Sequence, residues 1–146
     1  MSTPTRTIDV LLVEDDAGDE LITREAFEQN KIANTLHVAR DGQEGLDFLY
    51  RRGDHELAPR PDLVLLDLNL PKYDGRQLLE QIKSDPELCD IPVVVLTTSS
   101  AEEDILRSYK LHANAYVTKP VDLDQFMSAV RQIDEFFVQV VRLPGH

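Results

Sequence analysis

The chain has 146 residues, of which 42% are hydrophobic and 29% are charged. This length and composition are typical of one compact soluble domain and argue against a disordered chain. The 27 acidic residues outnumber the 15 basic ones and give a formal net charge of −12. Nucleic acids and anionic lipids attract clustered basic side chains, and the densest basic pair is Arg51-Arg52. The charge therefore argues against binding to nucleic acid or to a membrane.

Features that report on cellular location all favour the cytoplasm. Residues 1–7 are polar and are expected to form a flexible N-terminus, without the apolar stretch of a secretory signal. The longest apolar runs fall far below the roughly 18 residues that span a bilayer. The single cysteine, Cys89, has no partner for an internal disulfide and is expected to be inert.

Apolar runs and helical patterns alternate five times along the chain. The expected strands are residues 8–13, 35–39, 62–67, 93–96 and 115–118. The expected helices are residues 17–30, a segment containing Leu46, Leu49 and Tyr50, a segment containing Leu78, Leu79 and Ile82, residues 101–111, and a long helix from about residue 122. Residues 51–61 are polar, contain glycine and proline, and are expected to form a surface loop. Continuously apolar strands predict an α/β fold in which helices cover both faces of a doubly wound parallel sheet, as one domain over residues 8–146.

Polar residues stand where four of the expected strands end. Glu14 and Asp15 follow the first strand, Asp67 ends the third, Thr97 follows the fourth and Lys119 follows the fifth. In doubly wound sheets, function collects at the carboxyl ends of the strands. Carboxylates gathered there repel one another unless a cation joins them or their pKa values are raised. A hard divalent ion is the simpler solution, and Mg²⁺ prefers oxygen ligands. The pattern predicts a Mg²⁺ site at this edge.

The same residues suit the transfer of a phosphoryl group. Asp67 is the natural acceptor, because in-line attack by a carboxylate needs mainly positioning and charge neutralisation. Lys119 offers a positive charge and Thr97 a hydroxyl group, and both suit the oxygens of a phosphoryl group. The expected product is an acyl phosphate.

Four segments together resemble the receiver domain of two-component response regulators. They are residues 13–16, residues 66–71 with Asp74-Gly75, residues 97–99 and residues 116–120. The resemblance covers roughly residues 8 to 135, and all the chemical positions of the family are present in order. It implies a (βα)5 sheet with the flavodoxin-like strand order 2-1-3-4-5 and an extended C-terminal helix.

The resemblance also assigns roles around the metal ion. It implies that Asp67 is the phosphoacceptor and that Asp15, Asp67 and the backbone carbonyl of Asn69 ligate Mg²⁺. Glu14 would act through a bound water molecule. Thr97 and Lys119 would contact the phosphoryl group.

Further implied roles concern the conformational switch. Tyr116 would change rotamer when Thr97 moves toward the phosphoryl group. The side chains of Asn69 and Ser99 would tune the lifetime of the phosphorylated state, and the peptide bond before Pro120 would be cis.

Some of these residues have simpler interpretations. Asp16 or Asp19 is expected to cap the first helix or to face solvent. Thr98 and Ser99 suit the cap of the fourth helix, and Tyr116 also suits a plain core position. The histidines share no metal-binding spacing and are expected to be structural or exposed: His37, His55, His112 and His146.

Three alternative functions stay open at this point. A phosphorelay intermediate would pass the phosphoryl group on to a histidine phosphotransfer protein. A phosphatase of the haloacid-dehalogenase type also uses aspartate and Mg²⁺, but it places the nucleophile on its first strand with a second acid two residues later, where this chain has Asn69 after Asp67. An interaction module with an inactive pocket would lack at least one of the chemical residues. The chain is therefore expected to be a signalling protein that catalyses only its own phosphorylation and dephosphorylation.

The C-terminal helix indicates how the protein signals. Only this helix and a tail follow Pro120, so the output is expected to be protein–protein contact. Its apolar surface is too wide for one face, so residues 134–143 are expected to pack against a second protomer or a partner. A homodimer would also use the face formed by the fourth helix, fifth strand and fifth helix. The alternative is that the tail folds back on its own core. The long loop before the third strand, together with Phe136-Phe137 and the ending Leu143-Pro144, resembles stand-alone receivers that partner phytochrome-type histidine kinases.

Overall fold

A computed structural model of the chain describes residues 7–29, 34–68, 75–97, 115–118 and 124. In this part of the chain, five parallel strands form one sheet in the order β2-β1-β3-β4-β5. The strands are β1 (Ile8–Val13), β2 (Asn34–Ala39), β3 (Leu63–Asp67), β4 (Val93–Thr97) and β5 (Ala115–Thr118). The flavodoxin-like strand order predicted from the sequence is confirmed.

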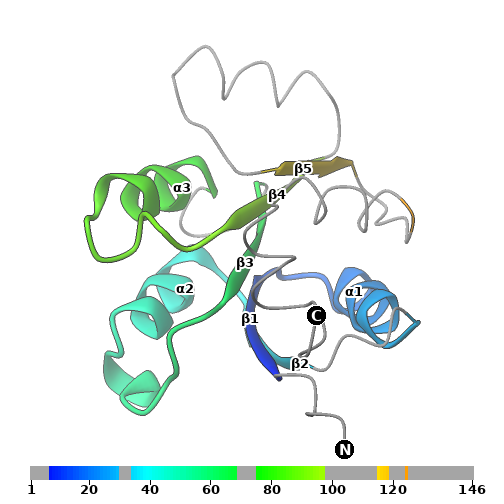
Figure 1. Cartoon of the computed structure of the whole chain (residues 1–146), viewed down its shortest axis with the longest axis horizontal. Helices are drawn as coiled ribbons and strands as arrows, with labels where there is room; N and C mark the ends of the chain where they lie inside the picture. The colour runs from blue at the N-terminus through cyan, green and yellow to red at the C-terminus, as the bar shows by residue number, and fades with distance from the viewer. Residues whose placement is uncertain (1–6, 30–33, 69–74, 98–114, 119–123, 125–146) are drawn as a thin grey trace, which may run out of the picture.

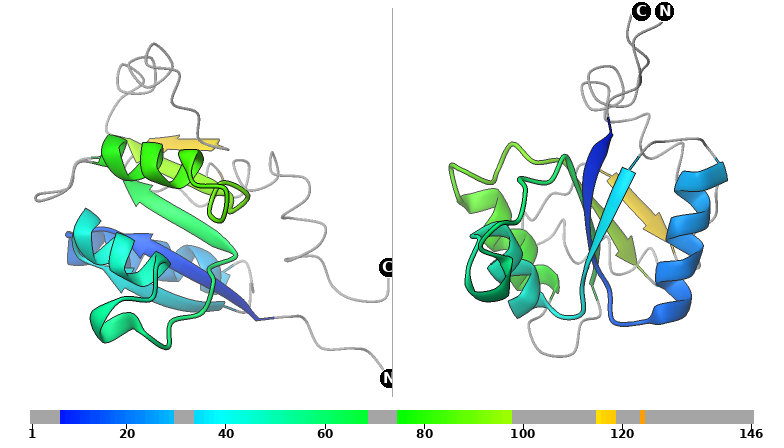
Figure 2. Two further views of the ribbon diagram at one scale, coloured as in Figure 1. Left: turned by 90° about the vertical axis from the view of Figure 1, so that its left-hand side faces the viewer. Right: turned by 90° about the horizontal axis from the view of Figure 1, so that it is seen from below.

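The described helices cover both faces of the sheet. They are α1 (Ala17–Gln29), α2 (Gly42–Leu49) and α3 (Gly75–Ser84), with a short 3₁₀ turn at Gly53–His55. Figures 1 and 2 show α1 on one face and α2 with α3 on the other. The fourth helix predicted from the sequence lies outside the described residues, as does the fifth apart from Asp124. None of the three described helices has the length and apolar character needed to cross a membrane.

The central strands form the core. Every residue of β3 and β4 is buried, and β1 is buried except at Asp9. Burial of one valine or leucine side chain contributes about 1.5–3 kcal/mol, so within the described residues this sheet supplies a large part of the hydrophobic stabilisation. The continuous apolar runs of the sequence thus correspond to strands covered on both faces.

Residues 51–60 are exposed or half-buried, as expected for the surface loop predicted there, and the loop begins with a defined helix end. Arg51 ends the helix in the left-handed region with a φ of 55°. Its amide donates to the Phe48 carbonyl at 3.2 Å, and the Arg52 amide donates to the Asp47 carbonyl at 2.8 Å. These two bonds form a Schellman motif, in which glycine is the usual left-handed residue. Because arginine gives no glycine-like signal, the sequence did not predict this end of the helix.

Two of the four histidines lie in the described part of the chain. His37 approaches Asp9 with 3.0 Å between Nε2 and Oδ1, and His55 approaches Glu44 with 3.4 Å between Nε2 and Oε2. Their rings flank Phe48, with centroid distances of 5.0 Å and 5.5 Å. These contacts agree with the structural role predicted for both histidines.

A candidate metal centre at the carboxyl edge of the sheet

Strand register brings the ends of β1, β3 and β4 to one edge of the sheet. Val13 of β1 lies beside Leu66 of β3, and Asp67 lies beside Leu96 of β4. Glu14 therefore follows β1 at the level where Asp67 ends β3. Thr97 comes one residue after Leu96 and ends β4, whereas the sequence placed it just beyond that strand.

Three carboxylates meet at this edge. One oxygen atom from each of Glu14, Asp15 and Asp67 lies within 4.8 Å of the other two. Glu14 and Asp67 are buried, at 0% and 2% exposure, while Asp15 is exposed. The group is thus anchored in the protein on one side and open to solvent on the other.

Backbone hydrogen bonds fix the chain around these carboxylates. The Glu14 amide donates to the Ala39 carbonyl at 2.9 Å and extends the pairing of β1 with β2. The Leu68 amide donates to the Leu96 carbonyl at 3.2 Å and does the same for β3 and β4. The backbone of Glu14 and that of Leu68, the residue after Asp67, are therefore held by neighbouring strands.

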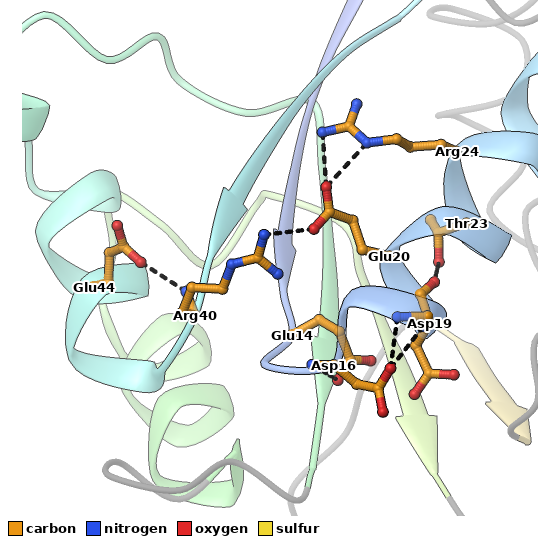
Figure 3. Close-up of polar contacts among 9 residues, drawn as sticks. Glu14, Asp16, Asp19, Glu20, Thr23, Arg24, Arg40 and Glu44 are labelled. Atoms are coloured by element: carbon orange, nitrogen blue, oxygen red, sulfur yellow. Dashed lines mark hydrogen bonds and ion pairs between the residues drawn. The ribbon is translucent and has the colours of Figure 1, made fainter.

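Asp16 caps the helix that follows the first two carboxylates. Its Oδ1 accepts hydrogen bonds from the amides of Gly18 at 2.7 Å and Asp19 at 3.1 Å (Figure 3). An aspartate at this position satisfies amide groups that have no partner within the helix and complements the helix dipole. The capping role predicted for Asp16 is confirmed.

The start of α3 lies against the backbone at the end of β3. A Cβ atom on Gly75 would be 2.6 Å from the Asp67 carbonyl oxygen and 2.7 Å from the Leu68 Cα atom. Only glycine permits this approach, because no side chain fits between the two backbones. The helix therefore supports the backbone of Asp67 directly.

The donor set fits a hard divalent cation. All three side chains offer carboxylate oxygens, which Mg²⁺ and Mn²⁺ prefer over nitrogen or sulfur, and Mg²⁺ commonly uses one or two carboxylates and keeps several waters. Without a cation, the mutual repulsion of three carboxylates this close opposes folding. The exposed side at Asp15 leaves room for water or for an entering ligand.

The structure brings together some of the residues predicted for the site. Glu14, Asp15 and Asp67 form the carboxylate group, and Thr97 is 2% exposed on the neighbouring strand. Tyr116 lies in β5 beside Val95 by register. The other predicted residues lie outside the described part of the chain: Asn69, Ser99, Lys119 and Pro120.

Sequence reasoning missed Arg40 and Glu20. Arg40 follows Ala39, whose carbonyl accepts the hydrogen bond from the Glu14 amide, and Glu20 lies in the helix that Asp16 caps. Arg40 follows β2 directly, as Glu14 follows β1. Its position directly after a predicted strand could have indicated that it lies at the carboxyl edge of the sheet. Glu20 lies within α1 and gave no such signal, because its contact with Arg40 joins residues 20 apart in the sequence.

Comparison with known proteins agrees with this geometry. A family model described as the response regulator receiver domain matches residues 10–131. The response regulator Rcp1 of Synechocystis sp. is 46% identical over 93% of this chain and 92% of its own length.

Solved structures give the same result. The bacteriophytochrome response regulator AtBRR is 44% identical with a TM-score of 0.82, covering 90% of this chain and 94% of its own. The Mn²⁺-bound form of Rcp1 is 45% identical with a TM-score of 0.75, covering 94% of this chain and 99% of its own. The phosphorylated cyanobacterial phytochrome response regulator RcpA has the same identity, 45%, and TM-score, 0.75, over 95% of this chain and 99% of its own.

Proposed function

The chain belongs to the family of response regulator receiver domains, and from this premise we propose that it accepts a phosphoryl group on Asp67 in a Mg²⁺-dependent reaction. The observation that carries the proposal is the meeting of Glu14, Asp15 and Asp67 at the carboxyl edge of the sheet. Asp67 is the member of this group that ends the central strand β3 and has Thr97 on the next strand. A carboxylate held there is positioned for attack on a phosphoryl donor.

In the proposed reaction, a carboxylate oxygen of Asp67 attacks the phosphorus atom of a phosphohistidine. The new P–O bond forms as the P–N bond breaks, and the imidazole leaves. Thr97 donates its hydroxyl hydrogen to a phosphoryl oxygen, and Lys119 balances the negative charge. Hydrolysis of the acyl phosphate later returns the protein to its starting state.

Residues of this chain would also hold the metal ion. Asp15, Asp67 and the backbone carbonyl of Asn69 would be the ligands, and Glu14 would act through a water molecule. When bound, Mg²⁺ supplies positive charge that lowers the repulsion between the carboxylates and the incoming phosphoryl oxygens. Support comes from the carboxylate donor set and from the Mn²⁺-bound form of Rcp1.

The proposed signal passes from Thr97 to the neighbouring strand. Thr97 pairs in register with Thr118 of β5, two residues after Tyr116. Movement of Thr97 toward the phosphoryl group favours a second rotamer of Tyr116 and shifts the conformation of the surface around β5. The side chains of Asn69 and Ser99 set how long this state lasts.

The proposed partner is a histidine kinase of the phytochrome type. Similarity to AtBRR and RcpA supports this partner, since their names connect both with phytochromes. We expect a cytoplasmic homodimer that forms through the surface around β5 and the C-terminal residues 134–143. Output by protein contact is favoured over the phosphorelay and phosphatase alternatives, for which no feature of the site argues specifically.

Intact-mass spectrometry of the wild-type protein tests this function. The protein is incubated with a small phosphoryl donor or a phosphorylated histidine kinase, in Mg²⁺ or in excess chelator. The expected result is one added phosphoryl group per chain in Mg²⁺ and none in chelator. Steady turnover of a phosphate ester without an adduct would instead support the phosphatase, and no adduct with either donor would contradict the proposal.

A further inference from the structure

A chain of ion pairs links α1 to the end of β2, where the Ala39 carbonyl accepts a hydrogen bond from the Glu14 amide. The Arg40 Nη2 atom lies 2.6 Å from Glu20 Oε1, and the Arg24 Nη2 atom lies 3.0 Å from Glu20 Oε2 (Figure 3). The Arg40 amide also donates to Glu44 Oε1 at 2.7 Å, which connects the same residue to the first turn of α2. Arg40 therefore contacts two helices from the end of β2.

Two contacts with the end of β2 hold the segment 14–20, which contains the carboxylates of Glu14 and Asp15. The segment 14–20 is held at its first residue by the hydrogen bond from the Glu14 amide to the Ala39 carbonyl. It is held at its last residue by the ion pair between Glu20 and Arg40. Consecutive residues at the end of β2 thus hold both ends of the segment that contains Asp15.

The ion pair is well formed for a contact near the surface. The Glu20 side chain is only 15% exposed. Desolvation by burial would raise the pKa of Glu20, but hydrogen bonds from Arg40 and Arg24 outweigh it and hold the pKa below its usual value of 4.5. The carboxylate is therefore charged at neutral pH, and this link is lost only as the pH falls through the lowered pKa.

We propose that Arg40 is a positioning residue for the divalent-ion site. By holding Glu20, it fixes the start of α1 and with it the exposed carboxylate of Asp15. This inference rests on the proposed function, because it concerns the affinity of the same carboxylates for Mg²⁺. Metal sites depend on such support, since ligands that move freely pay an entropic cost on binding.

Arg24 provides a matched control for this role. It binds the same Glu20 carboxylate, and its side chain is 47% exposed, compared with 51% for Arg40. Arg24 and Glu20 belong to the same helix, however, so their pair does not connect α1 to β2. Replacing either arginine by alanine removes one positive charge near the site, but only R40A removes the connection.

The two possible effects of these substitutions have opposite signs. Loss of a nearby positive charge alone strengthens the binding of a divalent cation, and this effect acts in both variants. Loss of positioning weakens binding, and this effect acts only in R40A. Removing a residue that contacts a metal ligand directly lowers the metal affinity about 10- to 100-fold. Arg40 contacts Glu20 rather than a ligand, so we expect a smaller loss of affinity in R40A, about threefold to tenfold.

The test is calorimetric titration of Mg²⁺ into the full-length wild type, R40A, R24A and R40K, with thermal unfolding of each protein without metal. We expect a higher Kd in R40A, an unchanged or lower Kd in R24A, and an intermediate Kd in R40K, because lysine restores the charge but not the planar fork of donors. The midpoints of unfolding without metal are expected to be similar in R40A and R24A, which separates positioning from a general loss of stability.

Two outcomes would overturn the inference. One is a wild type that binds Mg²⁺ while R40A binds it as tightly or more tightly. The other is an equal loss of affinity in R40A and R24A. A wild type that binds no Mg²⁺ contradicts the proposed function itself and is thus distinguishable from a failure of the role assigned to Arg40.

Discussion

Replacing Gly75 by alanine is expected to lower the free energy of unfolding by about 1–3 kcal/mol, the usual cost of inserting a methyl group where no space exists. The new Cβ would lie 2.6 Å from the Asp67 carbonyl oxygen and 2.9 Å from that of Leu68. Both are backbone atoms. Asp67 ends β3 and the Leu68 amide is bonded to the Leu96 carbonyl of β4, so neither can move without disturbing this edge of the sheet. Relief of the clash therefore moves either α3 or the backbone that carries the Asp67 carboxylate.

Urea unfolding of the Gly75→Ala and Gly45→Ala variants tests this expectation. A Cβ atom on Gly45 would be 3.3 Å from the Leu78 Cδ2 and Val13 Cγ2 atoms, which belong to side chains that can shift. Alanine also favours a helix over glycine by about 1 kcal/mol, so the Gly45 variant is expected to change stability little. A Gly75→Ala variant as stable as the wild type would mean that the start of α3 does not pack closely against the backbone at the end of β3.

The second large effect is expected for Asp15→Asn. Loss of a residue that hydrogen-bonds a metal ligand lowers metal affinity about 10- to 100-fold, and loss of the ligand itself should weaken Mg²⁺ binding by more than this. Asp15 is the exposed member of the carboxylate group and is a proposed direct ligand. Asparagine keeps the shape of the side chain but removes its charge. The protein without metal should become more stable, because one of three mutually repelling carboxylates is lost.

Thermal unfolding with and without Mg²⁺ measures both parts of this prediction. At a Mg²⁺ concentration about 100 times the wild-type Kd, binding stabilises the wild type by about 2.7 kcal/mol, and a loss of affinity of about 100-fold or more should reduce this to about 0.4 kcal/mol or less in Asp15→Asn. Asp16→Asn is the control, because asparagine can still cap α1 and the same charge is lost one residue away. Equal Mg²⁺ responses in the wild type and Asp15→Asn would exclude Asp15 as a ligand.

The sheet was predictable from the sequence because its central strands are buried on both faces. The runs 63–66 and 93–96 are apolar without alternation, and the structure places them in β3 and β4 with every residue buried. The predicted and observed strand ends differ by one residue where backbone hydrogen bonding rather than side-chain polarity determines the end, as at Thr97. The left-handed Arg51 was not predictable, because the contacts that hold it there are backbone hydrogen bonds that arginine does not signal.

The carboxylate group was predictable for a related reason. In a parallel sheet, the carboxyl ends of adjacent strands meet, so Asp15 and Asp67 are brought together whatever the lengths of the intervening helices. The supporting contacts were not predictable in this way. The approach of Gly75 to the Asp67 backbone and the pairing of Arg40 with Glu20 depend on how helices pack on the sheet, and no local pattern encodes that distance.

Intact-mass spectrometry of the wild type, Asp67→Asn and Asp62→Asn, each with a phosphoryl donor in Mg²⁺, tests whether Asp67 is the phosphoacceptor. Asp62 precedes the other end of the same strand, where its Oδ2 accepts a hydrogen bond from the Asp9 amide at 2.8 Å. One added phosphoryl group is expected on the wild type and on Asp62→Asn, and none on Asp67→Asn. A phosphoryl group on Asp67→Asn at the wild-type level would contradict this role of Asp67.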